Sequence, residues 1–281
     1  MAAATKGRER SSFYTWMAIA VVVIVVATFV VVKVTRNASS TNTVADTPAS
    51  LYLQGEVTTP NMTVANAVSH LISASAVSPL TFIASQPTLS LKGKPDFLYV
   101  GAEFCPFCAA ERWAVAVALG RFGTLSGLEL TTSSDAVGET DPNTPTLTFV
   151  HATFSSPYLS FEAVETQNRA HQTLQKMDAR QLAVFSKYDQ NSYLRANAVG
   201  YPGSIPFLDI GNRYFQAGSN FSPSVLSGLS QSTIAAGLAN ASSPITQEIV
   251  GAANEITAAI CSLTGARPAP VCHAPSITAP S

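Results

Sequence analysis

Charged residues are scarce in this chain of 281 residues: only 12% are Asp, Glu, Lys or Arg, and the net charge is −1. Nucleic acids bind to strongly basic surfaces, so we expect no nucleic-acid partner. Histidines are few and scattered, and the chain has no H-E-x-x-H, G-x-S-x-G or P-loop motif. These absences argue against a metallohydrolase, an α/β-hydrolase and a P-loop protein. We expect neither a bound metal nor a cofactor.

Cysteine is also scarce, with four residues, but two of them form a C-P-F-C tetrad. Cys105 and Cys108 follow an apolar, strand-like run at 97–100 and precede a helix-like run. This order places the thiols at a predicted helix N-terminus, where unpaired N–H groups and the helix dipole favour negative charge. Because the thiolate is the reactive form of cysteine, the pattern predicts thiol–disulfide exchange.

A C-x-x-C pair has other interpretations. Haem attachment requires a histidine where Ala109 stands. A four-cysteine zinc site needs a second close pair, whereas prolines and ten intervening residues separate Cys261 from Cys272. We favour a structural disulfide between Cys261 and Cys272, with a second, electron-relaying redox pair as the alternative. Metal binding by Cys105 and Cys108, with a histidine, also stays open.

The N-terminus predicts a membrane anchor. Residues 11–32 carry no charge and would form a helix of about 33 Å, enough to cross a bilayer core. We favour an uncleaved anchor over a cleaved signal peptide because Lys33 and Arg36 follow directly and no A-x-A site lies beside the span. An even cysteine count then fits an oxidising, extracytoplasmic compartment. Four glycosylation sequons, at Asn37, Asn61, Asn220 and Asn240, fit the same side.

The remaining chain divides by composition and periodicity. We expect a cytoplasmic stub and anchor at 1–34, a flexible linker at 35–60, one folded domain at 61–275 and a disordered tail at 276–281.

Periodicity and turn residues predict the individual elements of the folded domain. The expected helices lie at 62–76, from the tetrad to about 120, and at 172–188, 223–239 and 244–263. The expected strands lie at 97–100, 128–132, 146–153, 158–164, 207–210 and 213–216. We expect the strands at 146–153 and 158–164 to form a hairpin, and Gly211-Asn212 to form the turn of another.

A downstream segment strengthens the redox interpretation. Ser204, Ile205 and Pro206 immediately precede a predicted strand and hairpin. A strand, a C-x-x-C pair, a helix and then x-Ile-Pro entering a hairpin together resemble the thioredoxin fold. The resemblance implies that Pro206 is cis and packs beside the cysteines. It also implies that 134–200 is an insertion between the second core strand and this proline.

A closer resemblance rests on the run from Tyr99 to Trp113 and the run from Gly203 to Asn212. Together they resemble domain of unknown function family 929, whose members are prokaryotic, membrane-anchored and thioredoxin-like. The resemblance covers roughly residues 50–275. The expected fold class is therefore α/β and thioredoxin-like, with an N-terminal transmembrane helix.

Roles for the site residues follow from their chemistry. Cys105, nearer the helix start, should be the nucleophile and Cys108 the buried resolving thiol. Pro106 suits the first helical position. Phe107 offers an apolar contact to a client and, with Pro106, Ser204 and Ile205, lines the expected groove. Glu103 is either a proton relay to the buried thiol or a solvated loop carboxylate, and Trp113 is expected in the core.

The expected function is disulfide donation or isomerisation in secreted or surface proteins by a single-pass membrane protein. A quinone-linked membrane protein would reoxidise the pair. The tetrad leaves the direction of electron flow open. The alternatives are a non-catalytic, chaperone-like binding domain with structural disulfides, and a metal-delivery protein that uses the C-x-x-C pair.

Overall fold

A computed structural model describes residues 47–68, 78, 80–189 and 203–277. Its central sheet is organised around β4 (Lys94–Gly101), the strand that leads to the tetrad. On one side β4 pairs in parallel with β9 (Ser160–Glu165), and on the other it pairs antiparallel with β10 (Phe207–Ile210). The sheet continues through β11 (Tyr214–Ala217) and β2 (Thr81–Phe82), while β3 (Ser90–Leu91) pairs with the start of β4. The predicted strand at 97–100 and the β10–β11 hairpin are confirmed, but the hairpin loop spans the three residues 211–213, so the return strand begins at Tyr214 rather than Arg213.

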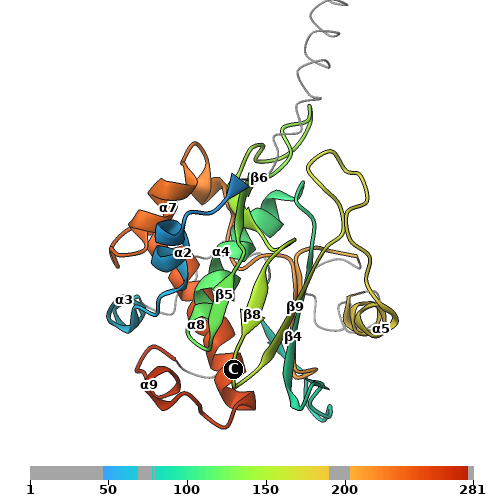
Figure 1. The fold of residues 1–281 in the computed structure, drawn as a ribbon, viewed down its shortest axis with the longest axis vertical. Helices are drawn as coiled ribbons and strands as arrows, with labels where there is room; N and C mark the ends of the chain where they lie inside the picture. Colours follow the sequence, from blue (N-terminus) through green and yellow to red (C-terminus); the bar gives the residue numbers. More distant parts are fainter. Residues whose placement is uncertain (1–46, 69–77, 79, 190–202, 278–281) are drawn as a thin grey trace, which may run out of the picture. The chain divides into compact units, whose positions relative to one another are not determined.

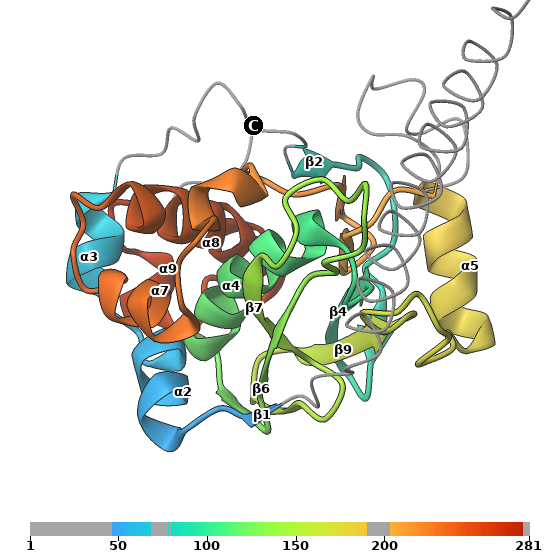
Figure 2. The same ribbon diagram turned by 90° about the horizontal axis from the view of Figure 1, so that it is seen from above.

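Side-chain alternation along β4 divides the core into two layers. Phe97 and Tyr99 belong to the larger hydrophobic cluster with the tetrad helix α4 (Pro106–Gly120) and with α8 (Pro244–Leu263). Leu98 and Val100 belong to the opposite cluster, with α5 (Ala179–Tyr188). Figure 1 and Figure 2 show α4 and α8 on one face of the sheet and α5 on the other.

The predicted linker is wrong for its last residues. Segment 47–58 forms a short strand, β1 (Thr47–Pro48), and a helix, α2 (Leu51–Thr58). Leu53 and Val57 lie one helical turn apart and are buried, which anchors α2 on the domain. The end of α4 approaches α2 so closely that a Cβ on Gly120 would collide with the carbonyl group of Thr58.

The predicted hairpin between 146–153 and 158–164 is also wrong. Its strands pair with three different partners: β7 (Pro145–Thr148) with β6 (Glu129–Thr132), β8 (Thr153–Ser155) with β5 (Thr124–Ser126), and β9 with β4. The described part of 134–200 therefore does not form a separate insertion, because β9 lies in the central sheet and α5 covers one of its faces. The physical reason is β9's register, which places Phe161 beside Phe97 and Val164 beside Val100.

Several predicted helices differ in extent. The helix expected at 172–188 begins at Ala179, where Asp178 and Gln181 form a capping box. The helix at 223–239 is interrupted, giving η1 (Pro223–Leu226) and α7 (Gln231–Gly237), whereas α8 matches its prediction. Of the helix expected at 62–76, α3 (Met62–Ala67) is described and the remainder lies mostly outside the described residues.

The two chain ends differ in how much of each the structure describes. The tail contains a further short helix, α9 (Ala269–Cys272), and Ser276 and Ile277 are buried, so the disordered tail predicted from 276 is wrong for these two residues. The expected anchor at 11–32 lies outside the described residues. Among the helices that the structure describes, none combines the length and apolarity needed to span a bilayer.

Candidate active site

The tetrad occupies the junction between β4 and α4. Cys105 is the N-cap residue of α4, and its Sγ accepts the backbone N–H of Cys108 at 3.2 Å. Pro106 takes the first helical position, where a missing N–H is harmless. Cys105 retains 6% of its accessible surface and Cys108 none. The geometry matches the sequence prediction of an outer and an inner thiol at a helix start.

The chain brings residues 204–206 to this junction from a hundred residues away. The Cys105 Sγ lies 3.7 Å from the carbonyl oxygen of Ile205, and the Ile205–Pro206 peptide bond is cis. Ile205 and Phe107 also pack against the thiol cluster, which consists of the buried residues Ala102, Cys105 and Cys108. Ser204 is turned toward α5, because its backbone N–H bonds to Asp189. The residue that precedes Pro206 thus lies beside Cys105.

The surroundings separate the pKa values of the two thiols. Burial alone would raise the pKa of Cys105, but hydrogen bonds from the Cys108 thiol and backbone, together with the charge of Arg112, lower it below its ordinary value of 9.0. Burial raises the pKa of Cys108 well above that value, and its hydrogen bond to Cys105 and the neighbouring charge raise it further. Cys105 is therefore the thiolate of the pair.

A buried ion pair between Arg112 and Glu165 is hydrogen-bonded to the backbone just before the tetrad. Arg112 donates through Nε and Nη2 to the two carboxylate oxygens of Glu165 at 2.8 and 2.7 Å, and both side chains are fully buried. The same Nη2 donates to the carbonyl oxygen of Ala102 at 2.7 Å, and that oxygen also accepts the Cys105 N–H. Arg112 thus links the ends of β4 and β9 to the thiol turn.

Glu103 is buried, which excludes the solvated-carboxylate interpretation. It retains 3% of its surface, and its carboxylate accepts the Thr148 hydroxyl at 2.8 Å. Its backbone N–H bonds to the carbonyl oxygen of Gln167, which extends the pairing between β4 and β9. Glu103 is therefore fixed at the turn that precedes Cys105.

The rim of the site includes residues that sequence reasoning missed. Phe104 packs against the thiol cluster, and its ring stacks on His171 with 4.0 Å between centroids. His171 in turn contacts Glu139 at 2.8 Å. Among the site residues that the sequence analysis did not identify, only Arg112 could have been found from its position, because it lies one helical turn beyond Cys108. The long-range partners Glu165 and His171 could not have been found in this way.

The sequence profile of a domain of unknown function, DUF929, matches residues 81–262. This match covers more than half of the chain and includes both tetrad cysteines and Pro206. The chain belongs to the DUF929 family. No curated protein and no solved structure matches it.

The second cysteine pair of this DUF929 protein is bonded. A disulfide joins Cys261 near the end of α8 to Cys272 in α9, with 5.5 Å between their Cα atoms. Cys272 lies beyond the matched range. Within the described part of the chain, no cluster of three His, Cys, Asp or Glu side chains could hold a metal ion. Trp113 lies in the core as expected, and its Nε1 donates to the Pro145 carbonyl at 3.0 Å.

A buried carboxyl group, Glu111, and a partly buried one, Glu255, lie on the α4 side of the DUF929 domain. Glu111 is fully buried and accepts the Asn220 N–H at 2.9 Å, and the Asn220 side chain donates to Glu255 at 3.2 Å. Burial raises the pKa of Glu111 to about 8 despite the bonds from Asn220 and Gln216, and burial raises that of Glu255 to about 7. Asn220 is itself fully buried, so the sequon at this position is not a surface site.

The pKa of Glu111 predicts that the folded state loses stability as pH rises. A carboxyl group whose pKa is higher in the folded state than in the unfolded state holds its proton preferentially when folded. The free energy of unfolding should therefore fall between about pH 4.5 and 8, by up to about 1.4 kcal/mol per pH unit. Glu111→Gln should flatten this decline in urea titrations across the pH range.

The matched control for this measurement is Asp135→Asn, which removes an exposed carboxylate. Asp135→Asn should leave the slope of stability against pH unchanged. An unaltered slope in Glu111→Gln would show that Glu111 does not bind the proton.

Proposed function

We propose that this DUF929 protein is a membrane-anchored, thioredoxin-like thiol–disulfide oxidoreductase. The observation that carries the proposal is the placement of Cys105: a helix N-cap thiol with a lowered pKa, 3.7 Å from the carbonyl oxygen that precedes a cis proline. The thiolate of Cys105 is the nucleophile of the exchange reaction. The backbone of residues 204–206 beside it provides a surface along which a client chain can align.

The topology supports the thioredoxin-like assignment. The order β4, α4, β9, α5, β10, β11 and α8 is a parallel strand–helix–strand unit followed by an antiparallel hairpin and a final helix. Helices cover both faces of the sheet. On this reading the added segment is the one that holds β5 to β8, between α4 and β9, rather than the predicted 134–200.

The Cys105–Cys108 pair would donate its disulfide in two thiol–disulfide exchange steps. A client thiolate attacks Sγ of Cys105 in the oxidised pair, which breaks the Cys105–Cys108 bond and releases Cys108 as thiolate. A second client thiolate then attacks the client sulfur of the mixed disulfide and releases Cys105. The client is oxidised by two electrons and the pair is reduced to a dithiol. Reoxidation passes those two electrons to a quinone-linked membrane protein.

The residues around the thiols have roles in this cycle. A client chain would contact an apolar rim formed by Phe104, Phe107 and Ile205. Pro106 and Ser204 lie next to these residues in the chain. Glu103, buried next to the turn, carries a proton to or from Cys108 as that thiol leaves or returns. The clients are thiols of secreted or surface proteins.

The extracytoplasmic location rests on separate grounds. The apolar residues 11–32 would anchor the chain in the bilayer. The Cys261–Cys272 disulfide supports an oxidising compartment, because such bonds rarely persist in the cytosol.

The reduction potential of the Cys105–Cys108 pair tests the proposal and its direction. Full-length protein would be equilibrated with glutathione buffers, and the pair followed by thiol alkylation and mass spectrometry. We expect a value nearer −120 mV than −270 mV, as in donors of disulfides. A value near −270 mV would overturn donation in favour of reduction. Failure of the two thiols to form a disulfide with each other would overturn the oxidoreductase itself.

A further inference from the structure

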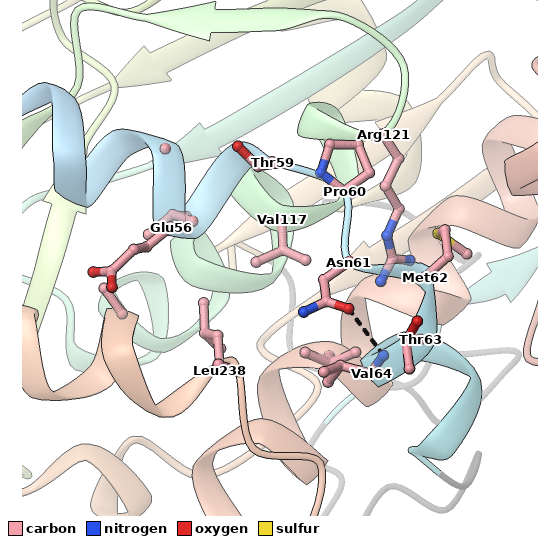
Figure 3. Close-up of a pocket in the computed structure, with 15 residues that line it drawn as sticks. Glu56, Thr59, Pro60, Asn61, Met62, Thr63, Val64, Val117, Arg121 and Leu238 are labelled. Atoms are coloured by element: carbon pink, nitrogen blue, oxygen red, sulfur yellow. Dashed lines mark hydrogen bonds between the residues drawn. The ribbon is translucent and has the colours of Figure 1, made fainter.

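A cavity of about 440 Å³ lies at the far end of α4 from the thiols. Its walls come from α2, α3, the end of α4, α7 and α8, and Figure 3 shows their side chains. Since α4 has 15 residues, the cavity is about 20 Å from Cys105. It is therefore separate from the redox site.

Arg121 brings a buried positive charge to this cavity. It retains 5% of its surface, and its Nη1 donates to the Ala253 carbonyl at 3.2 Å and to the Thr257 hydroxyl at 2.7 Å. Among the residues that the structure describes, no carboxylate lies within ion-pair distance of it. Burial lowers the pKa of Arg121 to about 10, with no acidic neighbour opposing the effect. A buried charge without a counter-ion is costly, and an anion would offset that cost.

The other walls combine polar and apolar groups, and the apolar side chains give the cavity a hydrophobic side. Met62, Val64, Val117 and Leu238 line the cavity, and Figure 3 shows the guanidinium of Arg121 extending toward the Met62 side. The acidic side chain of the lining, Glu56, bonds to the Tyr52 hydroxyl and lies across the cavity from Arg121 in the same view. A single cation with an acid opposite suits a ligand with one negative charge rather than two.

We propose that this cavity binds a small amphiphilic carboxylate, with its carboxylate on Arg121 and its hydrocarbon body against Met62, Val117 and Leu238. Small-molecule pockets combine apolar surface with a few placed polar groups, as this cavity does, and its volume of about 440 Å³ falls in the usual range. The guanidinium offers a carboxylate paired N–H donors.

Isothermal titration calorimetry of the full-length chain in lipid nanodiscs tests the site with octanoate, octan-1-ol and acetate. We expect octanoate to bind at least about tenfold more tightly than octan-1-ol, which lacks the charge. Acetate, which lacks the hydrocarbon, should bind far more weakly than octanoate. Equal affinity for octanoate and octan-1-ol, or no octanoate binding beyond that of empty nanodiscs, would overturn the proposal.

Two variants assign the binding to this cavity. Arg121→Met should weaken octanoate about tenfold or more, and Arg121→Lys should weaken it less because the cation remains. Lys176→Met, which removes an exposed cation outside the cavity, should leave the affinity unchanged. Undiminished octanoate binding by Arg121→Met would contradict the assignment.

Arg121 also joins α4 to α8, so a variant that spares it is needed. Gly55 lines the cavity, and a Cβ placed on it meets nothing within 4 Å. Gly55→Phe should fill the space and abolish octanoate binding, while the circular dichroism spectrum and melting temperature without ligand are maintained. Undiminished binding in Gly55→Phe would place octanoate elsewhere and overturn the proposal.

Discussion

Cys105→Ser should reduce thiol–disulfide exchange to the uncatalysed rate, whereas Cys108→Ser should accumulate a mixed disulfide between Cys105 and the client. The difference follows from the structure, because Cys105 is the outer thiol with the lowered pKa and Cys108 is fully buried beneath it. Without Cys108 no internal thiol resolves the intermediate. Each reduced variant would be mixed with a peptide that contains one disulfide, and the products followed by non-reducing electrophoresis and mass spectrometry. In Cys108→Ser the Cys105 thiolate attacks the peptide disulfide, forms the mixed disulfide and releases one peptide thiol.

The pH dependence of alkylation provides the control. In Cys108→Ser, Cys105 should react with iodoacetamide with an apparent pKa below 9.0, and faster at neutral pH than a free model thiol. In Cys105→Ser, Cys108 should react slowly at the same pH. A Cys105 rate no greater than that of the model thiol would favour the non-catalytic binding domain.

Arg112→Met should destabilise the domain by about 3–5 kcal/mol, because it leaves Glu165 charged, fully buried and without its counter-ion. It also removes the donor to the Ala102 carbonyl and a positive charge near both thiols. The pKa of Cys105 should therefore rise. Urea unfolding measures the first effect, and the alkylation rate against pH measures the second.

The double variant Arg112→Met/Glu165→Met separates the two effects. It removes both charges, so most of the lost stability should return. The pKa of Cys105 should nevertheless stay raised, since the cation is still absent. If alkylation of the double variant follows the wild-type pH profile, Arg112 is purely structural and does not act on the thiol.

Predictions succeeded where neighbours in the sequence decide the structure. The apolar run before the tetrad, the proline at the first helical position and the Gly211-Asn212 turn each specify their local backbone, and β4, α4 and the β10–β11 hairpin form as expected. The Cys261–Cys272 disulfide was also predictable, because the two cysteines enclose only a short loop.

Predictions failed where a distant segment decides. Two apolar runs separated by a short polar loop predict a hairpin, but β9 instead pairs with β4, more than sixty residues earlier in the chain at each paired position. Polar composition predicts a linker before residue 60, but α4 offers a surface that buries Leu53 and Val57. Neither the pairing of β9 with β4 nor the packing of α2 on α4 can be predicted from the residues of β9 or α2 alone. Hydrophobic burial depends on which surface the rest of the chain supplies.

The family, the thiol pair at a helix start and the strand that leads to it can all be predicted from residues adjacent in the chain. The surroundings of the thiols depend on long-range contacts instead: the Arg112–Glu165 ion pair, the burial of Glu103 and the stacking of Phe104 on His171. The same holds for the unpaired charge of Arg121 in its cavity. Burial and pairing set the pKa values and the cost of a charge, and both are properties of the folded chain.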